Sequence, residues 1–133
     1  MQTPAEIVMA SYEAYTAGKV EDLLALFADE VEWEFVGPQS ELRYAGARRT
    51  KAEIRDVLQQ MGEDEEVHTF GPTEEIIECG DRLVVVGEVK GKVKCSGRLC
   101  GREYVSPWVH IFTVREGKIV GWRGFYDTAA RLL

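Results

Sequence analysis

The sequence has few of the residues that build metal, phosphate and cofactor sites. Only two of its 133 residues are histidines and three are cysteines, and His68 and His110 stand far apart. No cysteine or histidine spacing matches a zinc site. No glycine-rich phosphate loop precedes a helix, because Gly117 and Lys118 fall in a predicted hairpin. The sequence therefore predicts no metal site and no cofactor.

The chain also lacks a long apolar run and a positively charged stretch. No segment approaches the roughly 20 apolar residues that span a bilayer, and the N-terminus has no basic leader followed by an apolar block. The formal charge of −7 argues against nucleic acid, and the small cluster Arg48, Arg49 and Lys51 does not change this. The odd number of cysteines favours reduced thiols. We expect a cytoplasmic protein with no membrane or nucleic-acid partner.

The N-terminal half carries helix signals. Thr3 and Glu6 form a capping box, and Thr50 caps a later apolar stripe. Between them VEWEF, residues 31–35, alternates apolar and acidic residues at period two, as a half-buried strand does. Helices are predicted over residues 3–17, 20–28 and 51–61.

The C-terminal half carries strand signals. GDRL and REGK are hairpin connections, and the final turn DTAARLL is expected to be capped by Asp127. Long strands are predicted over residues 67–80, 81–94, 102–115 and 118–127. Three helices followed by about four antiparallel strands make one α+β domain over residues 1–133.

The strand around His110 is apolar on both faces. Trp108, His110 and Phe112 point one way, while Val109 and Ile111 point the other. A lone antiparallel sheet normally has one wet face, so something besides the helices must cover the second. A second copy of the chain is the simplest cover, and the pattern predicts a homodimer.

Three segments carry a family resemblance: AGKVEDLLALFADEVEWEF (17–35), YAGARRTKAEIRDVL (44–58) and HIFTVREGKIVGWRGFYDTAARLL (110–133). Together they resemble the SnoaL-like, ketosteroid-isomerase-like branch of the nuclear transport factor 2 superfamily. The closing hairpin is most similar to limonene-epoxide hydrolases and polyketide cyclases. The resemblance implies a cone-shaped, curved, mostly antiparallel sheet wrapped by about three helices. It also implies a mostly apolar pocket and usually a homodimer, but one fold hosts many activities.

The site residues that the resemblance implies are mostly absent from this chain. The aspartate of the epoxide hydrolases and polyketide cyclases falls on Gly124, and the epoxide hydrolases' arginine and second aspartate fall on Glu88 and Lys90. The ketosteroid isomerases' general base falls on Phe35. Only His110 coincides with a pocket histidine of the polyketide cyclases. We therefore interpret Gly124 as an emptied catalytic position.

His110 and Glu88 are the candidate acid/base pair. His110 could instead be a core histidine, and Glu88 with Lys90 could be a solvated ion pair. The ketosteroid isomerases' helix-one tyrosine falls near Ser11, beside Tyr12. A pocket is predicted between the concave side of the sheet and the first and third helices. Its predicted lining is Tyr15, Trp33, Phe35, Lys90, Trp108, Phe112, Trp122, Gly124 and Tyr126.

Three hypotheses follow for function. In the first, the protein is a cofactor-free isomerase, cyclase or hydrolase acting on a small apolar molecule through His110 and Glu88. In the second, it binds such a molecule without chemistry, because the family aspartate is absent at Gly124. In the third, the interior is filled and the chain is a dimeric interaction module. Polar groups that converge on a cavity favour the first, a dry cavity the second, and no cavity the third.

Overall fold

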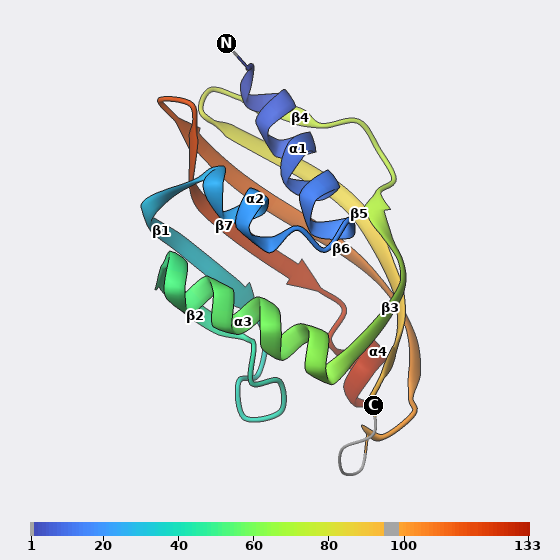
Figure 1. The fold of residues 1–133 in the computed structure, drawn as a ribbon. Coiled ribbons are helices and arrows are strands. Elements are labelled where there is room, and N and C mark those ends of the chain that lie inside the picture. Colours follow the sequence, from blue (N-terminus) through green and yellow to red (C-terminus); the bar gives the residue numbers. More distant parts are fainter. Residues whose placement is uncertain (1, 95–98) are drawn as a thin grey trace.

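The structure is a computed structural model that describes residues 2–94 and 99–133. Helices lie on one side of a curved, unclosed sheet (Figure 1). In chain order the elements are α1 (Pro4–Thr16), α2 (Val20–Ala25), β1 (Phe27–Val36), β2 (Gly46–Thr50), α3 (Lys51–Asp64), β3 (Glu65–Pro72), β4 (Ile77–Cys79), β5 (Arg82–Val93), β6 (Glu103–Arg115), β7 (Lys118–Tyr126) and α4 (Ala129–Leu132). The predicted α+β class and the wrapped, curved sheet are confirmed.

The helix starts follow the capping signals in the sequence. The Thr3 side chain accepts from the Glu6 N–H while the Glu6 carboxylate accepts from the Thr3 N–H, and Thr50 and Glu53 repeat this arrangement. The second helix is shorter than predicted. The Leu26 carbonyl already accepts from the Ile119 N–H of β7 at 2.9 Å, so the chain has left the helix there.

Among the described residues, the sheet has seven strands in the order β2-β1-β7-β6-β5-β3, with β4 paired to β5 beside this path. β1 runs parallel to β7, and the other pairs are antiparallel. The strand predicted over residues 67–80 is two strands, since β3 ends at Pro72, which lacks an N–H for the ladder. Sequence reasoning missed β2, a short edge strand whose Arg48 and Arg49 lack a strand's apolar alternation.

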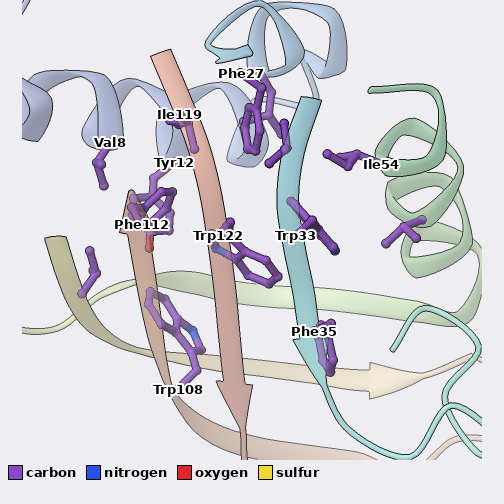
Figure 2. Packing of buried hydrophobic residues seen from close by; sticks show 14 of the residues in the cluster. Val8, Tyr12, Phe27, Trp33, Phe35, Ile54, Trp108, Phe112, Ile119 and Trp122 are labelled. Atoms are coloured by element: carbon purple, nitrogen blue, oxygen red, sulfur yellow. The ribbon is translucent and has the colours of Figure 1, made fainter. Parts of the chain in front are cut away.

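The core lies between the concave face of the sheet and the helices. Alternate residues of β5 and β6 point into it, including Val85 of β5. Trp108 and Phe112 of β6 are seen in Figure 2. Val109 and Ile111, on the other face of β6, are half-buried within the single chain. Both faces of this strand are therefore apolar, as predicted.

The cysteines differ from the prediction. Cys100 is disulfide-bonded and Cys79 is free and exposed, while Cys95 lies outside the described residues. The expectation of reduced thiols is wrong for Cys100, because an odd number of cysteines still permits one disulfide. Within the described ranges, no helix has the length and apolarity needed to cross a membrane. The same residues contain no group of three or more metal-binding His, Cys, Asp or Glu side chains.

Candidate functional site

His110 lies between two tyrosines from distant parts of the chain. The Tyr12 hydroxyl of α1 is 2.7 Å from Nδ1, and the Tyr126 hydroxyl at the end of β7 is 2.7 Å from Nε2. The imidazole is only 2% exposed. A neutral imidazole has one donor and one acceptor nitrogen, so one tyrosine donates to it and the other accepts from it. The three side chains form one hydrogen-bonded row.

Burial keeps this row uncharged. It lowers the pKa of His110 well below its ordinary value and raises the pKa of Tyr12 and of Tyr126 above theirs. Neutral imidazole and neutral phenols can both donate and accept a proton. The row can therefore pass a proton from one tyrosine to the other without a buried net charge.

A tryptophan fixes the plane of the imidazole. The Trp108 ring stacks on His110 with centroids 3.9 Å apart and planes 13° apart. Trp108 can lie flat because its cross-strand partner is Gly87, where an added Cβ would stand 2.2 Å from the indole. A glycine covered by a cross-strand ring is a known way to stabilise a sheet. The sheet therefore orients His110 through a glycine and a tryptophan.

Gly124 is also covered by a ring. It pairs with His110 across the sheet, and a Cβ on it would stand 2.4 Å and 2.6 Å from two atoms of the Trp122 indole. Trp122 in turn stacks on Trp33 with centroids 4.1 Å apart (Figure 2). The space beside Gly124 is therefore filled by a side chain of the same strand. The expectation that Gly124 lines the pocket is wrong.

A small apolar cavity, which we call the inner chamber, lies beside His110. Its volume is about 50 Å³, room for a few waters and far below the roughly 300–1,000 Å³ of typical ligand pockets. Its wall is almost wholly apolar and contains no carboxylate. The lining residues are Ser11, Tyr12, Tyr15, Leu23, Phe27, Trp33, Leu58, Met61, Phe70, His110, Phe112, Trp122 and Tyr126.

A second cavity of about 240 Å³, the outer chamber, shares part of this wall. The shared residues are Tyr15, Leu58, Met61, Phe70 and Tyr126. Because five side chains face both spaces, the two chambers adjoin. The outer chamber differs from the inner one in having charged groups, Glu65 and Arg131, in its wall.

These charged groups form a buried cluster. Glu65 is 8% exposed and Arg131 is 3% exposed. The Glu65 Oε1 atom accepts a hydrogen bond from the Tyr104 hydroxyl and another from Arg131 Nε at 3.0 Å. Burial lowers the pKa of Arg131, but the Glu65 carboxylate and Tyr104 outweigh this and raise it overall. Sequence reasoning missed both charged residues, because each stands in a stretch that looks like ordinary solvated surface.

Several predicted pocket residues do line the inner chamber: Tyr15, Trp33, Phe112, Trp122 and Tyr126. Phe35 does not, because it is fully buried in the core and stacks on Tyr126 with centroids 4.7 Å apart. Trp108 lies behind His110 and lines neither chamber.

Glu88 and Lys90 lie on the opposite face of the sheet. The alternation of β5 points Val85, Gly87 and Val89 inward and these two residues outward. Their side chains are 41% and 55% exposed and stand 4.0 Å apart as an ion pair. The predicted acid/base pair of His110 with Glu88 is therefore not formed, and Lys90 is not a pocket residue.

Asp127 does not cap the last helix. Thr128 occupies the N-cap position of α4 and makes no side-chain cap hydrogen bond. The backbone N–H of Asp127 instead donates to the Ser106 hydroxyl at 2.9 Å, which ties the end of β7 to β6.

The family assignment rests on sequence and structure together. A SnoaL-like domain model matches residues 8–122. An NTF2-like protein from Burkholderia xenovorans LB400 is 31% identical, with a TM-score of 0.79 over 97% of this chain and 92% of that one. TerC, co-crystallized with polyporic acid, is 28% identical, with a TM-score of 0.78 over 96% and 95% of the chains. A proposed polyketide cyclase from Xanthomonas campestris pv. campestris is 25% identical, with a TM-score of 0.74 over 95% of this chain and 91% of that one. No curated protein matches the sequence significantly. The chain belongs to the SnoaL-like family.

Proposed function

We propose that the protein binds a small hydrophobic molecule across the adjoining inner and outer chambers, with its reactive end beside His110, and catalyses a cofactor-free proton transfer on it, as an isomerase or a cyclase. The observation that carries the proposal is the row Tyr12–His110–Tyr126, whose members all line the inner chamber and hydrogen-bond at 2.7 Å. A positioned imidazole is the most common general acid/base in enzymes.

The row would work as a neutral relay on a ketone or a similar carbonyl compound. One tyrosine oxygen takes a proton from the carbon next to the carbonyl and passes its own hydroxyl proton to the imidazole of His110. The imidazole gives the proton on its other nitrogen to the second tyrosine, which donates its hydroxyl proton to the carbonyl oxygen. The substrate becomes its enol, and the imidazole changes tautomer. The reverse transfer to a different carbon completes an isomerisation.

The comparisons support this class of activity. A 25% identical relative is a proposed polyketide cyclase, and the 28% identical TerC was co-crystallized with polyporic acid. We therefore expect an unsaturated, oxygen-bearing hydrophobic metabolite. The buried row suits such a substrate, because developing charge on an enol oxygen is stabilised by a hydroxyl donor that water does not compete with.

A second candidate function is binding without chemistry. The inner chamber has no carboxylate in its wall, and Trp122 fills the space at Gly124 where the resemblance implies the family's aspartate. An apolar wall binds a ligand by burial alone. Trp33 and Trp122 would then serve only as flat surfaces for the ligand.

One experiment distinguishes catalysis from binding without chemistry. Polyporic acid and the apolar ketone 2-tetralone are titrated while the fluorescence of Trp33 and Trp122 is followed. Deuterium uptake at the carbons next to the 2-tetralone carbonyl is then measured by NMR in D₂O. The enzyme proposal predicts faster uptake with wild-type protein, and a loss of about 10²-fold or more in His110→Gln at unchanged affinity. Binding without uptake supports the second function, and no binding by either probe rules out both.

We further propose that the protein is a homodimer joined through the outer face of the sheet. Val109 and Ile111 are half-buried there, and Phe125 is 38% exposed. Val109 pairs with Phe125 across β6 and β7, so apolar side chains adjoin on this face. Covering it with the same face of a second chain gives a two-fold symmetric interface.

A further inference from the structure

The guanidinium of Arg131 has an unused hydrogen-bond donor. Nε donates to Glu65 at 3.0 Å, but Nη1 is buried and has no hydrogen-bond partner among the residues that the structure describes. An unsatisfied buried donor is costly, and more so when it carries charge. Arg131 lines the outer chamber. The missing acceptor is therefore best supplied by a molecule that occupies this chamber.

Tyr126 connects this donor to the His110 row. Its hydroxyl hydrogen-bonds to His110 Nε2 at 2.7 Å, while the Arg131 guanidinium carbon lies 5.3 Å from the centre of its ring. The ring therefore separates the guanidinium from the imidazole, and it belongs to the walls of both chambers. A ligand that reaches both groups must pass along the Tyr126 ring.

We infer that Arg131 binds an anionic oxygen of the ligand, so that the molecule is a hydrophobic acid with its charged end in the outer chamber. Its apolar body would lie toward the inner chamber and His110. This inference rests on the proposed function, because it names the chemical class of the same ligand. Glu65 already neutralises much of the guanidinium charge, so Glu65 limits how tightly the acid is held.

Helix α4 makes this arrangement possible (Figure 1). The chain turns after β7 and returns Arg131 to the start of β3, where Glu65 stands. The Tyr104 ring covers the guanidinium with its centre 4.4 Å from the guanidinium carbon. A ring face and one carboxylate hold the group in place and leave Nη1 for a third partner.

The test compares 2-naphthoate with 2-naphthamide, which have the same apolar body but differ in charge. Affinities are measured by tryptophan fluorescence and by calorimetry at pH 7. A charge-assisted hydrogen bond corresponds to a preference of about tenfold or more for the carboxylate. Arg131→Met should reduce the preference to about one, while Arg131→Lys should keep part of it. Arg55→Met is the matched control, because Arg55 is an exposed arginine of α3 that pairs with Glu21 at 2.9 Å and lines neither chamber, so it should leave the preference unchanged.

Glu65→Gln tests the same inference independently, in case Arg131→Met does not fold. The amide oxygen can still accept from Arg131 Nε, but the competing charge is gone, so the preference for 2-naphthoate should increase severalfold. A purely structural role for the ion pair predicts no such increase. Equal affinity of the wild type for the two probes, or an unchanged preference in Arg131→Met or Glu65→Gln, overturns the inference and leaves the proposed function standing. If neither naphthyl probe binds the wild type, the inference fails, and the binding of polyporic acid and 2-tetralone decides whether the proposed function stands.

Discussion

Replacing Gly124 with alanine should destabilise the fold through one contact. An added Cβ would stand 2.4 Å and 2.6 Å from two atoms of the Trp122 ring, closer than carbon atoms approach without a shift. Gly124 does not have a positive φ, so alanine can adopt its backbone conformation and the ring contact dominates. The Trp122 ring cannot easily move away, because it stacks on Trp33 with centroids 4.1 Å apart. Overpacking of this kind costs about 1–3 kcal/mol.

A double-mutant cycle isolates that contact. Trp122→Ala alone should cost about 3–5 kcal/mol, the usual range for removing a large buried aromatic ring. In that background Gly124→Ala meets no ring and should be neutral or stabilising by up to about 1 kcal/mol, because alanine restricts the unfolded chain. The two changes should therefore be coupled by at least about 1 kcal/mol. Urea unfolding followed by circular dichroism measures all four proteins.

Gly62→Ala is the matched control. Gly62 lies in α3, and a Cβ on it would meet nothing within 4 Å. The substitution should stabilise the protein by about 0.5–1 kcal/mol, since glycine is a poor helix residue. If Gly124→Ala were as stable as the wild type, or if its cost persisted after Trp122→Ala, then the ring would not be what excludes a side chain at Gly124.

Three further predictions concern pH, assembly and chemistry. Burial lowers the pKa of His110, so the folded protein keeps it neutral, whereas an unfolded histidine binds a proton below about pH 6.5. The free energy of unfolding should therefore not depend on His110 above that pH and should fall by up to about 1.4 kcal/mol per pH unit below it. His110→Gln should flatten this slope between pH 6.5 and 5 in urea unfolding, and an unchanged slope would contradict the burial argument. Ile111→Lys should convert the proposed dimer to monomer or precipitate it, and a folded wild-type monomer at micromolar concentration in sedimentation would rule the dimer out. Neither the wild type nor Gly124→Asp should hydrolyse limonene oxide above background in gas chromatography, because Glu88 lies on the outer face. Clear turnover by either protein would refute this.

Local signals in the sequence predicted the fold well. Thr3 and Thr50 fix two helix starts by side-chain hydrogen bonds to residues three positions along, and such short-range chemistry is readable without tertiary structure. Period-two alternation likewise placed Trp108 and His110 on the inner face. The parallel pairing of β1 with β7 was not predicted, because it joins distant segments and leaves no local mark.

The site was predicted less well, for reasons of register and distance. The resemblance places Glu88 at a catalytic position of one enzyme class and His110 at a pocket position of another, but β5 and β6 put the two side chains on opposite faces of the sheet. A one-residue difference in register decides the face. One of the two tyrosines that reach His110 is Tyr12, 98 positions away in the chain. Glu65 and Arg131 meet across 66 positions. Contacts of this kind depend on how the elements dock, which no local pattern records.

The glycines of the concave face explain why the candidate site centres on a histidine. Gly87 lets Trp108 lie flat and stack on His110, and Gly124 lets Trp122 lie flat with its ring centre 4.9 Å from the imidazole. A side chain at either glycine would lift a tryptophan and disturb the imidazole between them. The resemblance implies an aspartate at position 124 in related enzymes, and a carboxylate there would have to displace Trp122. In this chain, an aspartate at position 124 and a Trp122 ring that lies against His110 are therefore mutually exclusive. On the proposed function, proton transfer centres on His110 of β6 and its two tyrosines rather than on a side chain at position 124 of β7.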